Sequence, residues 1–234
     1  MKKEVSILIP TRFDSRYVID LCLRSIRKYT EYPYQIIVGD AGIDEQTRQF
    51  LETQKDIRVV SCSDPIRPKD HLARVVDTPY FIILHDDVQI IRKGWLKRRV
   101  EIMERSPQIG AVGVLAYTYL YGWRRFFAFS VLNKRFFPLV LLVRKEMQDE
   151  LDLFWGKIEG FDTGAIAYLQ FKRQKKWKMV NYKFNNDIKH WGGMTWLMRK
   201  KICKEKTNLD LDKLVEERNE KIESIKNILL SKAY

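Results

Sequence analysis

The most informative stretch of this sequence is Tyr80-Phe81-Ile82-Ile83-Leu84-His85-Asp86-Asp87-Val88. Its first five residues are aromatic or aliphatic, which predicts a strand at residues 80–84 that is buried on both faces, as in a parallel sheet. Three polar residues, His85, Asp86 and Asp87, follow this strand directly. Because α/β sheets bind ligands at the carboxyl ends of their parallel strands, we expect these side chains to line a binding crevice.

Two adjacent carboxylates in such a crevice are costly to desolvate unless a cation neutralises them. Oxygen ligands favour Mg²⁺ or Mn²⁺, and such ions commonly bridge a protein carboxylate and substrate phosphates. A solvated turn is the alternative interpretation of Asp86 and Asp87, because acidic residues are common in turns. The rest of the chain has to decide between the two.

Length, composition and charge set the outer limits. A chain of 234 residues is ample for one domain with a buried core, and a hydrophobic content of 45% excludes a disordered chain. The net charge of +13 predicts an anionic partner: nucleotide phosphates, an acidic membrane surface or nucleic acid. Three scattered cysteines indicate reduced thiols in a cytoplasmic protein. We recognise no signal peptide and no apolar run of membrane-spanning length.

Strands and helices alternate along the first part of the chain. The order β-α-β-α-β-α-β predicts a mostly parallel sheet with helices on both faces. The elements predicted around residues 80–84 are strands at residues 5–9, 35–38, 57–60, 109–115 and 139–143, and helices at residues 45–53, 70–76, 94–106 and 146–154. A further helix follows the first strand: Asp14 or Ser15 can cap it, and Val18, Leu21, Cys22 and Ile26 mark one of its faces.

Two later segments depart from this alternation. Residues 117–137 mix aromatic side chains with arginine and lysine, which suits a membrane interface, a sugar-stacking surface or an acceptor loop. Simple packing of these aromatics on the core is the alternative. Residues 211–229 place apolar residues at near-heptad spacing, which predicts an amphipathic helix. Docking on the body is favoured over pairing with a partner, because the run covers only about three heptads.

Three segments close the predicted strands at residues 5–9, 35–38 and 80–84, in this order: Ser6-Ile7-Leu8-Ile9-Pro10-Thr11-Arg12, Ile36-Ile37-Val38-Gly39-Asp40-Ala41-Gly42 and Leu84-His85-Asp86-Asp87. Together they resemble the signature segments of the family 2 glycosyltransferases with a GT-A fold. Residues 160–164 and 188–193 resemble that family's acceptor-side acidic motif and its late histidine-containing loop. The resemblance covers roughly residues 4–196 and leaves the terminal helix outside.

The resemblance implies an α/β fold of the GT-A type: a Rossmann-type, mostly parallel central sheet flanked by helices, followed here by the C-terminal amphipathic helix. Residues 1–200 would form the transferase domain, with a nucleotide-sugar-binding half at residues 1–115 and an acceptor-side half at residues 116–200. Residues 201–234 would be a helical extension.

The activity implied by the resemblance is inverting transfer of a sugar from a nucleotide sugar to an acceptor hydroxyl. A carboxylate would deprotonate that hydroxyl, while Mn²⁺ or Mg²⁺ would stabilise the leaving diphosphate. The expected partners are a UDP- or dTDP-type donor and a glycan, lipid-linked or protein acceptor, with peripheral contact to an anionic membrane on the cytoplasmic face. No nucleic acid is expected.

Carried over by position, the resemblance places five residues along the nucleotide. Pro10, Thr11 and Arg12 would lie beside it, with Thr11 near the base. Asp40 would accept a hydrogen bond from the base, which favours a uracil- or thymine-type ring. Asp86 would lie at the ribose or at a metal-bound water.

The resemblance also implies the metal ligands and the catalytic base. Asp87 would bind the cation, and His190 would approach the metal or the diphosphate from the far side of the cleft. His85 occupies the first place of the family's Asp-x-Asp motif, so it would either bind the metal or pack. The family's usual Glu-Asp pair is missing from the acceptor motif, where Asp162 is the best replacement as the base.

Two other functions are weighed against this one. The charge of +13 and the aromatic-basic segment would also suit a nucleic-acid-binding protein, although no known nucleic-acid-binding signature is recognised. The missing Glu-Asp pair and His85 would also suit a transferase-like module that binds a sugar or a nucleotide without turnover. Salt-sensitive DNA binding without nucleotide-sugar binding would distinguish the first of these.

Overall fold

A computed structural model describes residues 4–13, 15–62, 68–116, 135–136, 139–155, 164–182, 187–192 and 211–231. The main strands are β1 Val5–Phe13, β2 Tyr34–Ile43, β3 Ile57–Ser61, β4 Tyr80–Leu84, β6 Ile109–Gly113, β9 Val140–Arg144 and β10 Lys178–Asn181. The helices are α1 Arg16–Tyr29, α2 Glu45–Glu52, α3 Pro68–Arg74, α4 Trp95–Glu104, α6 Lys145–Leu151, α7 Ala165–Lys172 and α9 Leu211–Leu230. Two short pairs complete the described part: β5 Val88–Ile90 with β11 Ile188–His190, and β7 Leu115–Ala116 with β8 Arg135–Phe136.

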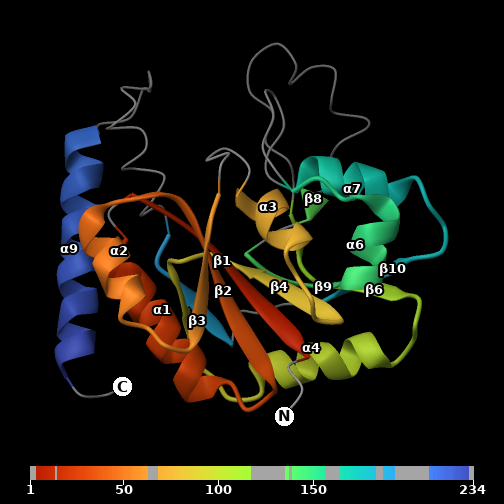
Figure 1. The fold of residues 1–234 in the computed structure, drawn as a ribbon, viewed down its shortest axis with the longest axis horizontal. Coiled ribbons are helices and arrows are strands. Elements are labelled where there is room, and N and C mark those ends of the chain that lie inside the picture. The colour runs from red at the N-terminus through yellow and green to blue at the C-terminus, as the bar shows by residue number, and fades with distance from the viewer. Residues whose placement is uncertain are drawn as a thin grey trace.

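The seven main strands form one sheet in the order β10-β6-β9-β4-β1-β2-β3 (Figure 1). Strand β1 lies between β2 and β4 and is parallel to both, β2 is parallel to β3, and β6 is parallel to β10. Only β9 runs antiparallel to its neighbours β4 and β6 in this sheet. The predicted mostly parallel sheet is therefore confirmed, and β4 has the predicted bounds.

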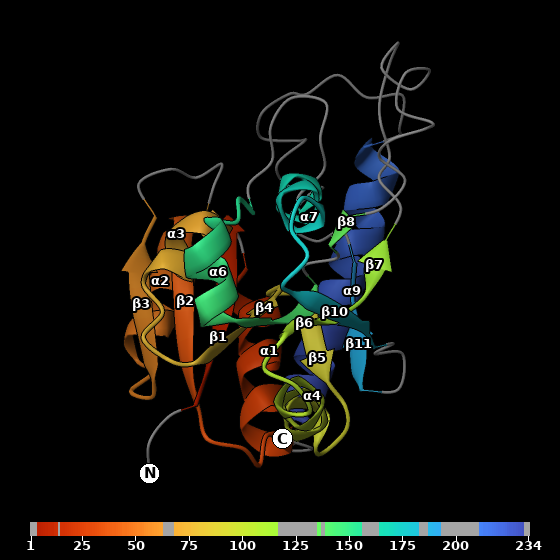
Figure 2. The ribbon, with the colours of Figure 1, turned by 90° about the vertical axis from the view of Figure 1, so that its right-hand side faces the viewer.

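Alternate residues of the central strands pack on opposite faces of the sheet. Ile7 and Ile82 belong to a core shared with α1, α2 and α4, whereas Leu8 and Ile83 belong to a second core shared with α3, α6 and α7. Figure 2 shows α3, α6 and α7 above the sheet and α1 and α4 below it. Both faces are covered, which explains why these strands are continuous apolar runs.

Phe81 gives a direct test of this packing. The ring is fully buried in β4, between strands β1 and β9. We expect Phe81→Ala to lower the free energy of unfolding by about 3–5 kcal/mol, because the lost transfer energy and the cavity add. Urea unfolding measures the change. Val59→Ala on the edge strand β3 is the control: Val59 is 43% exposed, so it should cost less than about 1 kcal/mol. A similar small loss for both variants would contradict the two-faced core.

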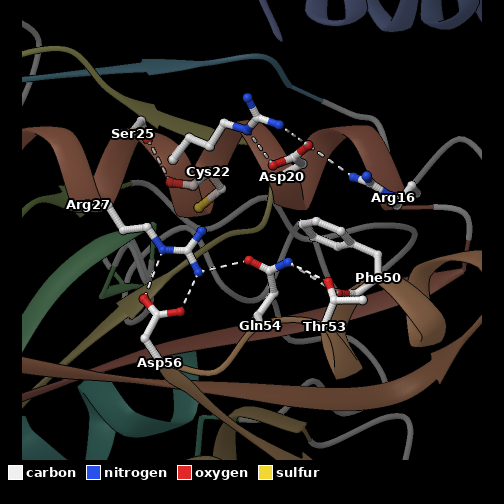
Figure 3. Close-up of polar contacts among 10 residues, drawn as sticks. Arg16, Asp20, Cys22, Ser25, Arg27, Phe50, Thr53, Gln54 and Asp56 are labelled. Carbon is white, nitrogen blue, oxygen red and sulfur yellow. Dashed lines mark hydrogen bonds and ion pairs between the residues drawn. The ribbon is translucent and has the colours of Figure 1, made fainter.

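Polar contacts tie helix α1 to neighbouring parts of the chain, and Figure 3 shows those that Arg27 makes with Gln54 and Asp56. Arg27 donates two hydrogen bonds to the carboxylate of Asp56, at 2.6 and 2.8 Å, and a third to Gln54. Ser25 Oγ donates to the carbonyl of Cys22 and accepts the backbone N–H of Ile90 at 2.9 Å. This last bond fixes β5, the strand that follows the acidic pair, against the helix.

The C-terminal helix α9 packs beside α1 (Figure 1). Ile222 and Ile225 form a small third core with Val18 and Leu21 of α1 and with Trp191. The prediction that this helix docks on the body is confirmed. None of the described helices combines the length and the apolar character needed to cross a membrane.

Candidate active site

Two buried carboxylates lie in the turn between β4 and β5. Asp86 and Asp87 are only 5% and 6% exposed, while His85 before them is partly exposed. A buried carboxylate is costly without hydrogen bonds or a compensating charge. Asp86 meets this requirement through hydroxyl groups and Asp87 through two histidines, which indicates different roles for the two aspartates.

Asp86 is held by hydroxyl groups. Thr11 Oγ1 donates to Asp86 Oδ2 at 2.6 Å, and Ser15 Oγ lies 3.2 Å from the same oxygen. Thr11 comes from β1, and Ser15 is the N-cap residue of α1. These contacts fix the carboxylate at the carboxyl end of β1, where the nucleotide was expected.

Asp87 is held by two histidines. Asp87 Oδ1 lies 3.1 Å from His190 Nε2 and 4.0 Å from His85 Nδ1. Burial alone would raise the pKa of Asp87, but the hydrogen bond to His190 and the electrostatic interactions with His85 and His190 outweigh it and lower the pKa. Asp87 is therefore an anion that faces two nitrogen ligands.

These three residues form a group able to hold a metal ion. One ligand atom from each of His85, Asp87 and His190 lies within 4.8 Å of the other two. Among the residues that the structure describes, no other group of three such side chains comes together in this way. About a third of each imidazole is exposed, so the cluster opens to solvent on one side.

His190 reaches Asp87 because β11 pairs with β5 in antiparallel register, with His190 opposite Val88. The backbone N–H of Trp191 then donates to the carbonyl of Asp87 at 3.0 Å. A residue 103 positions later in the sequence is thereby fixed beside the acidic pair. Neither short strand was predicted, because three residues give too little periodicity to recognise.

Lys69 is a functional candidate that sequence reasoning missed. Its ammonium lies 3.1 Å from His85 Nε2, on the side of the imidazole away from Asp87 Oδ1. Lys69 lies in α3, and no motif in the sequence marked it. An ammonium next to a group that could hold a metal ion is suited to contact a phosphate.

Asp40, at the end of β2, is already engaged by its own loop. Asp40 Oδ1 accepts the backbone N–H groups of Gly42 and Ile43 at 3.0 and 3.1 Å, and Oδ2 accepts Arg48 Nη1 at 2.7 Å. These contacts are those of a turn residue with an added ion pair. Each carboxylate oxygen has two lone pairs, so Oδ2 retains a lone pair for a further donor.

The remaining predicted residues fall into two groups. Pro10 and Arg12 at the end of β1 are partly exposed, whereas Thr11 is fully buried and its hydroxyl already serves Asp86. Thr11 therefore orients Asp86, and its predicted place near the base stays a prediction. Asp162 and most of the aromatic-basic segment 117–137 lie outside the described residues.

Cys22 lies beneath the acidic pair without joining the metal-binding group. Its sulfur is 3.8 Å from the carbonyl oxygen of His85 and is fully buried. Burial raises the pKa of this thiol, and the negative charges of Asp86 and Asp87 raise it further. Because the thiolate is the form that binds metals, the surroundings of Cys22 disfavour it as a ligand.

Comparison with solved structures identifies the fold. The structure of TarS 1-349 from S. aureus superposes with a TM-score of 0.59 at 14% identity, over 98% of this chain and 72% of that one. The mannosyltransferase PcManGT from Pyrobaculum calidifontis, in complex with GDP-Man and Mn²⁺, gives a TM-score of 0.56 at 15% identity. The match covers 100% of this chain and 77% of that one. TarS 1-349 in complex with UDP-GlcNAc gives a TM-score of 0.53 at 13% identity. This match covers 77% of this chain and 59% of that one. The predicted GT-A fold is confirmed.

Comparison of the sequence with protein families supplies the assignment. A search of curated proteins found no match. The model of the family described as glycosyl transferase family 2 matches residues 6–172, a range that includes β1 from its second residue on, β2, β4 and the acidic pair. This chain belongs to glycosyl transferase family 2.

Proposed function

We propose that this glycosyltransferase moves a sugar from a UDP- or dTDP-linked donor to an acceptor hydroxyl, with inversion at the sugar carbon and with a divalent metal ion. The observation that carries the proposal is the group formed by His85, Asp87 and His190 at the carboxyl end of β4. It lies next to Asp86 and the end of β1, where the donor is expected.

The side chains of this group are chemically suited to a metal ion. Two imidazole nitrogens and one carboxylate are a donor set that first-row transition metals accept, whereas Mg²⁺ prefers oxygen ligands. We therefore favour Mn²⁺ over Mg²⁺. When bound, the ion would neutralise charge on the leaving diphosphate. The neighbour that bound GDP-Man with Mn²⁺ shows that this fold accommodates such a pair.

Side chains of the protein would bind the donor and remove the proton from the acceptor hydroxyl. Asp86, which Thr11 holds in place, would accept a hydrogen bond from a ribose hydroxyl. Lys69, adjacent to His85, would bring a positive charge to the diphosphate. Asp162 would take the proton from the acceptor hydroxyl as that oxygen attacks the sugar carbon.

Release of UDP from UDP-sugars in the presence of Mn²⁺ tests the proposal. Many transferases hydrolyse their donor slowly without an acceptor, so the assay needs no knowledge of the acceptor. We expect release with at least one UDP- or dTDP-sugar, and none when a chelator removes the metal. Equal release with and without the chelator would contradict metal dependence.

Asp40 is proposed to recognise the base by accepting a hydrogen bond from its imide N–H. Asp40→Ala should weaken binding of the uridine or thymidine donor by about 1–3 kcal/mol, because the imide N–H of the base would be left without a partner. Calorimetry of UDP and of GDP with the wild type and the variant measures this. Equal binding of both nucleotides by the wild type would instead leave Asp40 as a turn residue.

The protein is further proposed to act on the cytoplasmic face of an anionic membrane, where a lipid-linked acceptor is one candidate. Changing Arg124, Arg125, Lys134 and Arg135 to Gln should remove salt-sensitive binding to anionic vesicles. Sedimentation with such vesicles at low salt is the measurement. If the wild type stays in the supernatant, membrane association is wrong, and a glycan or a protein remains as the acceptor.

A further inference from the structure

Strand β11 carries His190 on very little secondary structure. It has three residues and pairs only with the equally short β5. Side chains alternate along a strand, so a slip of one residue would turn His190 to the opposite face and bring Lys189 toward Asp87. A strand this short has few ladder hydrogen bonds to prevent such a slip. Its register must depend on contacts at its two ends.

The carboxyl end of β11 is fixed by Trp191. Its backbone N–H donates to the carbonyl of Asp87, and its indole packs in the core shared by α1 and α9. The indole N–H also donates to Gln89 of β5 at 3.3 Å. These contacts hold one end through packing.

The amino end is fixed by charge. Asp187, which directly precedes β11, is 4% exposed, and its carboxylate accepts Arg98 Nη2 at 2.6 Å and Arg99 Nη1 at 3.0 Å. Its backbone carbonyl accepts the N–H of Ile91, just after β5. Asp187 therefore joins the first residue position of the short sheet to two arginines of α4.

The burial of Arg99 indicates that this contact does more than add stability. Its guanidinium is fully buried and lies 4.6 Å from the ring centroid of Tyr182, and among the described residues its Nε and Nη2 have no hydrogen-bond partner. Replacing a buried ion pair by apolar residues is often neutral or stabilising. What apolar residues cannot supply is a directional anchor that specifies one register.

We propose that Asp187 is a positioning residue for the metal-binding group: anchored by Arg98 and Arg99, it holds β11 in the register that places His190 on Asp87. The part of this inference that concerns the metal rests on the proposed function. The part that concerns the register of β11 does not, and the two are measured separately.

The test compares Asp187→Asn with two other variants. Arg98→Gln removes one of the two ion pairs of Asp187. The Arg98 side chain is 37% exposed, so this variant should fold and serves as the test if Asp187→Asn does not fold. Asp56→Asn is the control, because Asp56 also pairs with an arginine but directly precedes β3, outside the short sheet of β5 and β11.

Two readouts are taken: hydrogen exchange of the peptide covering residues 187–192, and affinity for Mn²⁺ alone. We expect Asp187→Asn to speed exchange in this peptide at least about tenfold, without loss of global protection. We expect its Mn²⁺ affinity to fall about 10–100-fold, the range for residues that orient metal ligands. Arg98→Gln should also speed exchange and lower Mn²⁺ affinity, but by less than Asp187→Asn. Asp56→Asn should change neither quantity.

Unchanged exchange in a folded Asp187→Asn, or in Arg98→Gln if the first does not fold, would overturn the inference. Faster exchange with unchanged Mn²⁺ affinity would overturn its link to the metal. A wild type that binds no Mn²⁺ would refute the proposed metal site, and exchange alone would then decide the role of Asp187 in the register of β11.

Discussion

Asp87→Asn should keep the fold and lower Mn²⁺ affinity by on the order of 10²-fold or more. The amide has nearly the shape of the carboxylate but no negative charge, so the ion would lose its one anionic ligand among the three. Donor binding should lose its dependence on Mn²⁺ in the same variant. Titration with Mn²⁺, followed by titration with the nucleotide sugar, measures both effects.

Asp86→Asn is the matched comparison, since it makes the same change one residue earlier in the same turn. Its carboxylate contacts Thr11 and Ser15, so Mn²⁺ affinity should change far less than in Asp87→Asn. If Asp87→Asn binds Mn²⁺ as the wild type does, the assignment of Asp87 as the metal ligand is wrong.

Asp162→Asn should preserve donor and metal binding and lower the rate of transfer by on the order of 10²–10⁴-fold, the usual contribution of a general base. An asparagine keeps the size of the side chain but cannot accept the proton of the acceptor hydroxyl. A helix-capping role would predict nearly no effect, because Asn caps as well as Asp. The N-cap of α7 in the described part of the chain is Gly164.

The measurement for Asp162 is single-turnover transfer beside calorimetry of the donor. Full transfer by Asp162→Asn would move the search to Glu159 or to Asp152. Asp152 is the C-cap of α6, and its side chain is 83% exposed. Loss of donor binding together with transfer would instead indicate a structural role.

The sequence predicted the central strands well because burial on both faces leaves a plain signal. Strand β4 has its predicted bounds, and β1 and β2 extend past theirs into the polar segments that form the site. The antiparallel direction of β9 was not predicted, since an apolar run reads the same for either direction. β10 was missed because its four residues alternate only weakly between exposed and partly buried.

The site was predicted through resemblance, and its supporting contacts were not. His85, Asp87 and His190 were expected from motifs, and the structure brings them together. The bond from Thr11 to Asp86, the position of Lys69 and the anchor at Asp187 are tertiary contacts between residues far apart in the chain. No local pattern of residue types encodes such contacts.

Thermal unfolding of the wild type with UDP-, dTDP- and GDP-sugars, each with and without Mn²⁺, tests the central claim most directly. A saturating donor should stabilise the protein by about 2–4 kcal/mol, which raises Tm by roughly 5–15 °C for a domain of this size. We predict this shift for a UDP- or dTDP-sugar only with Mn²⁺, and its absence in Asp87→Asn. No shift with any donor, or an equal shift without Mn²⁺, would contradict a metal-dependent nucleotide-sugar site at His85, Asp87 and His190.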